Sequence, residues 1–339
     1  MARSHTPRLT RRGLLAAGGA AGLGALLTAC GDGGGSDSGG GGSWSFTDDR
    51  KKKVSLKGRP ERVVAYVGTA AALHDFGVDK RLVGVFGPTK LANGQPDPQA
   101  GDLPVDRLEV IGSAFGEFDI ERYAKLRPDV LIAPSYQPGK LWFVPEESKE
   151  KILELAPGIA LKASQVSLSR VIRRHGELAG ALGADLEAKK VSEAKRRFEK
   201  AAETLRETAE ERGGLKVLAT SGSRDLFYVA TPKTNADLIF LRELGVEVVV
   251  PDKVDKDGYF EPLSWENADK YGADVIMLDN RGQALQPEAL RKKPTWTELP
   301  AVQADQVIPW AYEPRFSYQG SLPLLEKLAS TLREAGKVR

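Results

Sequence analysis

Apolar and charged positions alternate with helical spacing through one long stretch of the chain, residues 184–213. The apolar positions in it are Val191, Ala194, Phe198, Ala201 and Leu205. Steps of three and four residues place these side chains in one narrow stripe along a helix, and the other positions are rich in Glu, Lys and Arg. The stretch contains no Pro and no Gly before Gly213, so we expect one mostly exposed helix about 40 Å long. A stray coiled-coil segment is the alternative interpretation.

Short apolar runs alternate with helical patterns on both sides of this stretch. Before it, strands are expected at residues 62–67, 82–86 and 129–133, and helices at 70–76, 120–126, 146–155 and 168–182. After it, strands are expected at 215–220, 246–250 and 274–278, and helices at 237–244 and 265–271. Such alternation is typical of parallel α/β layers. The predicted fold is therefore α/β, with two Rossmann-like lobes, residues 53–183 and 214–339, joined by one linking helix, residues 184–213.

One helix-and-strand unit occurs in both predicted lobes. Asp119-Ile120-Glu121 opens the first copy, and Ser264-Trp265-Glu266 opens the second. In each copy a capping residue precedes the helix, Glu follows two positions later, and an Asp starts the next strand. Glu121 and Glu266 therefore occupy equivalent points on two similar lobes, which argues against the coiled-coil alternative.

The first 52 residues have the features of a targeting segment followed by a tether. Residues 1–29 carry the pair Arg11-Arg12 of a twin-arginine signal, followed by an apolar run too short and too rich in glycine to span a membrane comfortably. The run closes with Leu27-Thr28-Ala29-Cys30, which is typical of a lipobox, so we expect a twin-arginine lipoprotein signal peptide and a diacylated Cys30. A chance cysteine beside an ordinary signal peptide is the alternative. Residues 30–52 begin with a run rich in Gly and Ser and are expected to form a flexible tether.

Composition argues against several classes of protein. The net charge of +3 includes four arginines of the leader, whose removal leaves −1, and no clustered basic face for nucleic acid is evident. With one cysteine and three histidines, we expect no resident metal site. The turn Tyr66-Val67-Gly68-Thr69-Ala70 lacks the glycines of a dinucleotide-binding loop, and Ser221-Gly222-Ser223 is no nucleophile elbow. We therefore expect that the chain is not an enzyme.

Three motifs in order around the linking helix resemble those of one family. They are Arg59-Pro60-Glu61-Arg62-Val63-Val64, Leu126-Arg127-Pro128-Asp129-Val130 and Trp296-Thr297-Glu298-Leu299-Pro300-Ala301-Val302. From about Lys53 onward, the chain resembles the substrate-binding lipoproteins of ABC importers for iron–siderophores, cobalamin and haem, in which a single long helix joins two lobes. Within that family it is most similar to binders of ferric hydroxamates of the ferrioxamine type.

The resemblance implies a monomer outside the cytoplasmic membrane, anchored by the lipid on Cys30. Such a protein captures a ferric siderophore between its lobes and delivers it to the membrane subunits of an ABC importer. Fe(III) enters only as part of the siderophore, and the protein carries no cofactor besides the lipid. Cobalamin or haem is the alternative ligand, and a purely structural lipoprotein is a further alternative.

Ligands of open α/β lobes bind beyond the carboxyl ends of the strands, where aromatic and arginine side chains gather in this sequence. The candidate ligand-binding residues are Tyr66, Phe86, Phe115, Tyr136, Trp142, Arg224, Tyr259, Asn280, Arg281, Trp310, Arg315, Phe316 and Tyr318. Further aromatic candidates in the same loops are Phe227, Tyr228, Phe260 and Tyr312, and several of all these aromatics are expected in the core.

Some roles follow from the resemblance alone. It implies that Tyr136 hydrogen-bonds the iron chelate and that Phe316 and Tyr318 are aromatic positions of the second lobe, with Tyr136 and Tyr318 facing one cleft. The family arginine expected near Phe115 is missing. Arg224, Arg281 or Arg315 is therefore expected to donate to the hydroxamate oxygens, with Arg224 and Arg315 ranked first. Ordinary exposed arginines are the alternative.

The resemblance also implies that one acidic residue on each lobe docks into arginine pockets of the importer. Glu121 and Glu266 are the expected docking residues because of their matched places in the repeat. The alternative is that each Glu only favours the first turn of its own helix, where a negative charge is stabilising.

Overall fold

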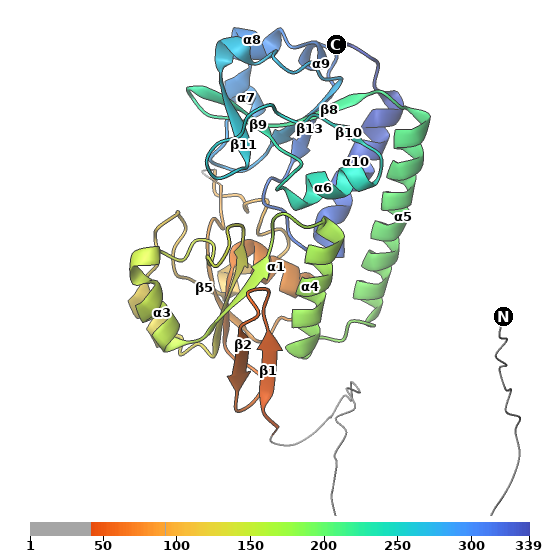
Figure 1. Cartoon of the computed structure of the whole chain (residues 1–339). Coiled ribbons are helices and arrows are strands. Elements are labelled where there is room, and N and C mark those ends of the chain that lie inside the picture. The colour runs from red at the N-terminus through yellow and green to blue at the C-terminus, as the bar shows by residue number, and fades with distance from the viewer. Residues whose placement is uncertain (1–41, 92) are drawn as a thin grey trace, which may run out of the picture. The chain divides into compact units, whose positions relative to one another are not determined.

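The computed structural model describes residues 42–91 and 93–339 (Figure 1). The signal peptide expected at residues 1–29, Cys30 and the tether up to residue 41 lie outside the described residues. Among the residues described, no helix is both long enough and apolar enough to cross a membrane.

The first lobe is built on a five-stranded parallel sheet in the order β5-β4-β3-β6-β7. Its strands are β3 (Val63–Tyr66), β4 (Leu82–Phe86), β5 (Glu109–Val110), β6 (Val130–Ser135) and β7 (Gly158–Lys162). Its helices are α1 (Val67–Asp75), α2 (Ile120–Lys125), α3 (Lys149–Leu155) and α4 (Leu168–Ala181). All residues of β3 and β6 are buried, because layers of side chains cover both faces of the central strands.

A hairpin that begins before the predicted lobe completes it. Strands β1 (Trp44–Thr47) and β2 (Lys53–Leu56) pair antiparallel. The Trp44 indole N–H donates to the Ala181 carbonyl at 2.8 Å, and the backbone N–H of Ala160 donates to Asp48 at 3.0 Å. The expected tether over residues 30–52 is therefore too long: residues 44–52 belong to the folded lobe, since an apolar residue at every second position of β1 faces the core.

The second lobe contains a mixed sheet in the order β11-β9-β8-β12-β13, and β10 also pairs with β8. Its strands are β8 (Lys216–Gly222), β9 (Leu226–Ala230), β10 (Glu247–Val248), β11 (Phe260–Ser264), β12 (Val275–Asp279) and β13 (Val307–Trp310). Strands β8, β10, β12 and β13 pair parallel, as expected, whereas β9 is antiparallel to both β8 and β11. The connection from β8 to β9 is a tight turn in which the Ser223 N–H donates a hydrogen bond to the Leu226 carbonyl. A turn that short can only join antiparallel strands.

The helices of this lobe are α6 (Ala236–Glu243), α7 (Pro287–Leu290), α8 (Pro294–Thr297), α9 (Pro300–Gln303) and α10 (Tyr318–Glu334). The helix expected at residues 265–271 is only a 3₁₀ turn, η3 (Trp265–Asn267). In the first lobe, the Asp119 side chain caps α2 by accepting from the Arg122 N–H at 2.9 Å. In the second lobe, the equivalent Ser264 hydroxyl accepts from the Asn267 side chain instead, so the first turn of a longer helix is left without its cap.

The linking helix α5 (Lys189–Glu211) is shorter than predicted and, as expected, mostly exposed. Residues 184–188 form a turn, in which the Glu187 N–H donates to the Asp185 side chain at 3.0 Å. One face of α5 packs along α10, and the two helices run side by side in Figure 1. Phe198 and Leu205 on that stripe are buried. The helix is therefore supported along its length by a second helix.

The two lobes share one apolar core on the side of α5. Residues of β3 and α4 belong to the same buried cluster as residues of β8, α6 and α10. Beside this core, the segment before α10 returns to the first lobe, where the Ser317 hydroxyl donates to Asp75 and Arg315 lies 3.5 Å from the same carboxylate. The lobes are thus held by α5, by shared packing and by a buried polar contact.

Candidate functional site: an aromatic cavity between the lobes

A cavity of about 590 Å³ opens between the lobes. Most of its lining residues follow the carboxyl ends of strands, whereas Tyr259 and Phe260 lie at the start of β11. The first lobe contributes Pro88, Ser113, Ala114, Phe115, Tyr136, Gln137, Trp142 and Phe143. The second lobe contributes Asp255, Asp257, Tyr259, Phe260, Arg281, Gln283, Tyr312 and Glu313. Its volume lies within the usual range for small-molecule sites.

Four aromatic rings form the first-lobe wall. The centroid of Trp142 lies 5.2 Å from that of Tyr136 and 5.4 Å from that of Phe115, and Phe143 lies 5.3 Å from Phe115. The rings meet in edge-to-face and tilted contacts, the arrangements that aromatic pairs prefer. Phe115 is 70% exposed although it belongs to this cluster, so it presents an apolar ring at the edge of the cavity.

Aromatic rings of the second lobe form the opposite wall. Phe260 and Tyr312 pack with centroids 4.9 Å apart, and the guanidinium of Arg281 lies 4.1 Å from the centroid of Tyr312. The Tyr259 hydroxyl donates to the Tyr136 carbonyl across the seam between the lobes. Gln137 and Asp257 make a second contact across this seam at 3.1 Å.

Arg281 is positioned by the end of its own strand. Asp279 closes β12, accepts from the Arg281 backbone N–H at 3.0 Å and also binds the Arg281 guanidinium at 2.8 Å. The second carboxylate on this guanidinium is Glu313, at 2.6 Å. Burial alone would lower the pKa of Arg281, but the hydrogen bonds to Asp279 and the charge of Glu313 raise it above its ordinary value. Arg281 is therefore a fixed cation at the base of the second-lobe wall.

Glu313 links both walls at the base of the cavity. It is 3% exposed and accepts from the Tyr66 hydroxyl at 2.6 Å and from the Trp142 indole N–H at 3.1 Å, both in the first lobe. Burial and the negative charge of Glu313 raise the pKa values of Tyr66, Tyr136 and Tyr312 well above the ordinary value. The three phenols therefore stay neutral at physiological pH and can serve as hydrogen-bonding groups.

The structure brings five of the candidate residues together in the cavity lining: Phe115, Tyr136, Trp142, Tyr259 and Arg281. Phe260 and Tyr312 of the wider aromatic set join them. Tyr66 lies behind the wall, where it contacts the lining residues Glu313 and Phe143, whereas Phe86 is fully buried in the first-lobe core. Trp310 is also fully buried, with its indole N–H on Asp237 at 2.5 Å, and Phe227 packs in the second-lobe core.

Other candidates lie away from the cavity, which corrects their predicted places. The Arg224 side chain is 94% exposed in the β8–β9 turn, where its carbonyl accepts from Lys293. Tyr228 is on β9, beside Phe260. Asn280 lines a separate hollow of about 210 Å³ near Asp237.

The three candidates around the start of α10 lie on the helix side of the molecule. Arg315 faces Asp75, Phe316 packs against His175, and Tyr318 packs between Phe76 and Phe198. Tyr318 therefore does not face Tyr136 across one cleft. The Ser317 hydroxyl caps α10 by accepting from the Gly320 N–H at 2.9 Å, and this start of the helix directs its first turn toward the first lobe and α5.

Several lining residues were missed, above all Glu313, Asp255, Asp257 and Phe143. Asp255 and Asp257 lie in the run Asp-Lys-Asp-Gly, which is an ordinary turn signal, and Asp255 accepts from the Gly258 N–H at 2.7 Å. Glu313 comes directly after Tyr312, a candidate, so proximity in sequence was its only available signal.

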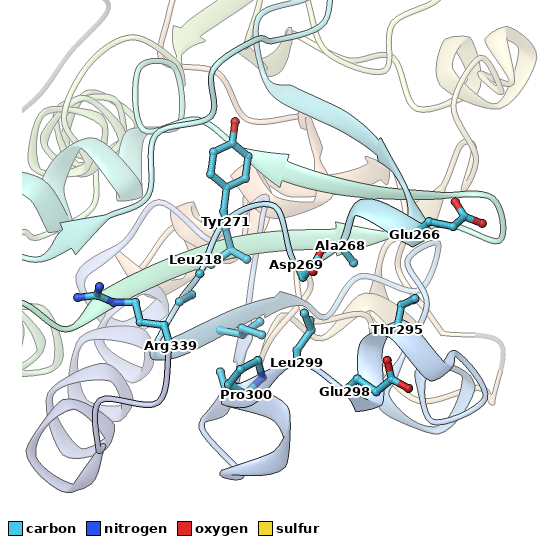
Figure 2. Close-up of a pocket in the computed structure, with 14 residues that line it drawn as sticks. Leu218, Glu266, Ala268, Asp269, Tyr271, Thr295, Glu298, Leu299, Pro300 and Arg339 are labelled. Atoms are coloured by element: carbon cyan, nitrogen blue, oxygen red, sulfur yellow. The ribbon is translucent and has the colours of Figure 1, made fainter.

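A second hollow of about 490 Å³ lies in the second lobe and shares no lining residue with the cavity. Figure 2 shows Glu266 and Glu298 on one side of it and Arg339 on the other, with Leu218 and Leu299 between them. Glu266 is exposed, as is Glu121 on the first lobe. These positions leave both acids accessible to a partner.

The fold and the cavity define a two-lobed binding protein, and comparison with known sequences gives its class. The family model described as "Periplasmic binding protein" matches residues 63–313, so the chain belongs to that family. The predicted family and fold class are confirmed. The family and the similar solved structures are substrate-binding receptors, and the chain is accordingly a binding protein and not an enzyme.

Among solved structures, the chain is similar to DesE, a ferric-siderophore receptor protein from Streptomyces coelicolor. The two are 47% identical, the match covers 87% of this chain and 100% of that chain, and the TM-score is 0.84. FeuA from Bacillus subtilis, a triscatecholate siderophore binding protein solved with ferri-bacillibactin, is 18% identical with a TM-score of 0.64, over 86% of this chain and 98% of that one. At that identity FeuA shares the fold alone. A search of curated proteins found no match.

Proposed function

We propose that this protein captures a ferric siderophore of the hydroxamate class in the cavity between its lobes and delivers it to an ABC importer. The similarity to the ferric-siderophore receptor DesE, at 47% identity over its full length, is the observation that carries this proposal. Siderophore binding, the hydroxamate class and delivery to an importer are all parts of the proposal.

The lining of the cavity has the chemistry that such a ligand requires. A ferric trihydroxamate already fills the octahedral shell of its iron with oxygens, so the protein has to supply packing and hydrogen bonds but no metal ligand. The rings of Phe115, Trp142 and Tyr312 offer apolar faces to the aliphatic spacers of the siderophore. Arg281 and neutral phenols such as Tyr136 offer N–H and O–H donors to the hydroxamate oxygens.

A titration with several ligands tests the proposal. The protein has five tryptophans, of which Trp142 lines the cavity, so quenching of tryptophan fluorescence reports binding. The ligands are ferric trihydroxamates, a ferric catecholate, haem and cobalamin. We expect saturable quenching with a ferric trihydroxamate at micromolar concentrations or below, and calorimetry should return one site. Saturation by haem or cobalamin alone would favour the alternative ligands, and no response to any ligand would favour a structural lipoprotein.

We infer that Glu121 and Glu266 dock the loaded protein onto the membrane subunits of the importer. Both are exposed and belong to matching segments of the two lobes. The double variant Glu121→Arg/Glu266→Arg should abolish uptake of the ferric ligand in cells while leaving its dissociation constant unchanged. The control is Glu154→Arg/Glu334→Arg, which reverses one exposed charge on each lobe away from the repeat. Equal loss of uptake in both double variants would contradict specific docking.

We also propose that the protein acts as a monomer outside the cytoplasmic membrane, held there by a lipid on Cys30. Cys30 is the only cysteine in the chain and closes the lipobox-like sequence. Cys30→Ser should move the protein from the membrane fraction to the soluble fraction without changing its affinity for the ligand. Retention of the variant in the membrane fraction would contradict the lipid anchor.

A further inference from the structure

We propose that Glu313 sets the charge preference of the cavity: by neutralising Arg281, it makes the site select ferric chelates without net negative charge. This inference rests on the proposed function for the kind of ligand. It adds a specificity-determining residue and a rule for the charge of the chelate.

The guanidinium of Arg281 is bound by two carboxylates. Asp279 lies at 2.8 Å from one terminal nitrogen and Glu313 at 2.6 Å from the other, and all three residues are less than 9% exposed. Each terminal nitrogen carries two N–H groups, so one on each is still free to donate after these bonds are made. Arg281 can therefore donate to an uncharged oxygen ligand, but its positive charge is already balanced.

The remaining charges on the lining are negative. Of the described residues that line the cavity, Arg281 is the only Arg or Lys, and Asp255, Asp257 and Glu313 are the carboxylates. Asp257 accepts from Gln137, which is neutral, and Asp255 accepts from backbone N–H groups; within residues 42–91 and 93–339, neither forms a salt bridge. With Asp279 behind the wall, the site contains four carboxylates and one guanidinium, and two of these carboxylates contact it.

The excess of carboxylates over cations at the site disfavours the binding of an anionic ligand. At an effective dielectric constant of about 20, one unit of charge placed several Å away changes an affinity by about tenfold or more. A ferric trihydroxamate core is neutral and meets no such opposition, whereas a ferric tris-catecholate carries three negative charges. Glu313 is the carboxylate that determines this preference for uncharged chelates, since it both lines the cavity and neutralises Arg281.

The test compares a neutral ferric trihydroxamate with a ferric tris-catecholate trianion on three proteins. In the wild type, we expect the trihydroxamate to bind at least about 100-fold more tightly than the trianion. Glu313→Gln keeps an acceptor for Tyr66 and Trp142 but removes the charge, and we expect the ratio of the two dissociation constants to fall at least about tenfold. Glu298→Gln removes one exposed charge from the same lobe at the separate hollow and should leave the ratio unchanged.

Equal affinities of the wild type for both chelates would overturn the inference, as would parallel changes for both chelates in Glu313→Gln. If that variant does not fold, the salt dependence of the wild type decides instead. Repulsion of the trianion should weaken as salt screens it, so its affinity should rise with ionic strength while that of the trihydroxamate stays constant. A falling affinity for the trianion would overturn the inference. Failure of every ferric siderophore to bind contradicts the proposed function itself.

Discussion

The two lobes meet on two sides of the molecule, and the contacts on these sides differ in kind. On the side of α5, apolar residues of both lobes form one continuous core with α4, α6 and α10. On the side of the cavity, the lobes meet through single hydrogen bonds and charges, such as Tyr66 to Glu313 and Gln137 to Asp257. The α5 side is thus a packed joint, whereas the cavity side is a polar seam.

We infer from this difference that the packed joint stabilises the fold, whereas the polar seam serves ligand recognition. A packed apolar joint resists rearrangement because every side chain there has fixed neighbours. A polar seam can exchange its partners for those of a ligand, since hydrogen bonds between protein groups have small net free energies. Each side contains a buried titratable group: Arg281 lies at the polar seam and His175 at the packed joint. Substitution of each residue tests the comparison.

The largest expected effect is the loss of the buried cation at the seam. Arg281→Met leaves Asp279 and Glu313 without their shared partner, and removal of one member of a buried ion pair typically destabilises a protein by about 3–5 kcal/mol. We expect that loss in the free energy of unfolding, measured by urea denaturation. Arg224→Met on the same lobe removes an exposed arginine and should change the free energy by less than about 0.5 kcal/mol. Similar values for both variants would contradict the structural role of the Arg281 pairs.

On the α5 side, His175 makes the joint sensitive to acid. It is fully buried against Phe316, and burial lowers its pKa from 6.5 to about 4. The unfolded chain therefore binds this proton more readily than the native state, so the contribution of His175 to stability is complete above pH 6.5 and declines as the pH falls toward 4.

The expected size of that decline is about 3 kcal/mol. Burial raises the pKa of Asp237 to about 6, and this group changes stability in the opposite direction between pH 6 and 4. The test therefore compares His175→Leu with the wild type, because Asp237 is common to both. From pH 7 to pH 4, the stability of the variant relative to the wild type should rise by about 3 kcal/mol in urea denaturation. A difference that stays constant with pH would contradict burial of a neutral His175.

At the cavity, we expect Phe115 to contribute to ligand binding but very little to the stability of the fold. Its side chain is 70% exposed, so Phe115→Ala should change the free energy of unfolding very little. Its ring contacts Trp142 and Phe143 and is expected to cover part of the ligand, so we expect a loss of about 1–2 kcal/mol in binding a ferric trihydroxamate. Leu155→Ala, at another exposed apolar residue of the same lobe, is the control and should leave the affinity unchanged. Unchanged affinity in Phe115→Ala, measured by calorimetry, would place the ligand elsewhere.

The smallest expected effect concerns the shape of the molecule. Because the joint includes α5, α10 and the buried contact of Ser317 with Asp75, we expect only small movements of the lobes on binding. Small-angle X-ray scattering curves of the free and loaded protein should nearly overlay. A marked compaction on loading would show that the joint bends.

The first lobe was the more predictable part of the fold. Its strands β3, β4 and β6 are continuous apolar runs bounded by turns, which is the pattern of a buried parallel strand, and the predicted ranges differ from them by at most two residues. Strand β11 was missed because Glu261 and Pro262 interrupt its apolar run, whereas β9 is an uninterrupted apolar run whose residues Phe227 and Tyr228 were assigned to a ligand-binding loop. The antiparallel pairing of both strands depends on the turn after Ser223.

The aromatic part of the site was more predictable than its charged part. Tyr136, Trp142 and Tyr259 follow from the tendency of rings to gather at loops beyond strands. Glu313 could not be predicted from the sequence, because a carboxylate usually lies in solvent and its partner Tyr66 is 247 positions away in the chain. Tyr318 was assigned to the cavity from family resemblance, but it belongs to a helix whose capped start places it at the joint.

The location of the ligand is tested most directly by removing the tryptophan that lines the cavity. A ferric trihydroxamate should quench the wild type strongly, and Trp142→Phe should lose most of the quenching at saturation because its remaining tryptophans lie outside the cavity lining. Trp296→Phe, in the second-lobe core, should keep the wild-type amplitude. Equal quenching of the wild type and Trp142→Phe would contradict binding between the two aromatic walls.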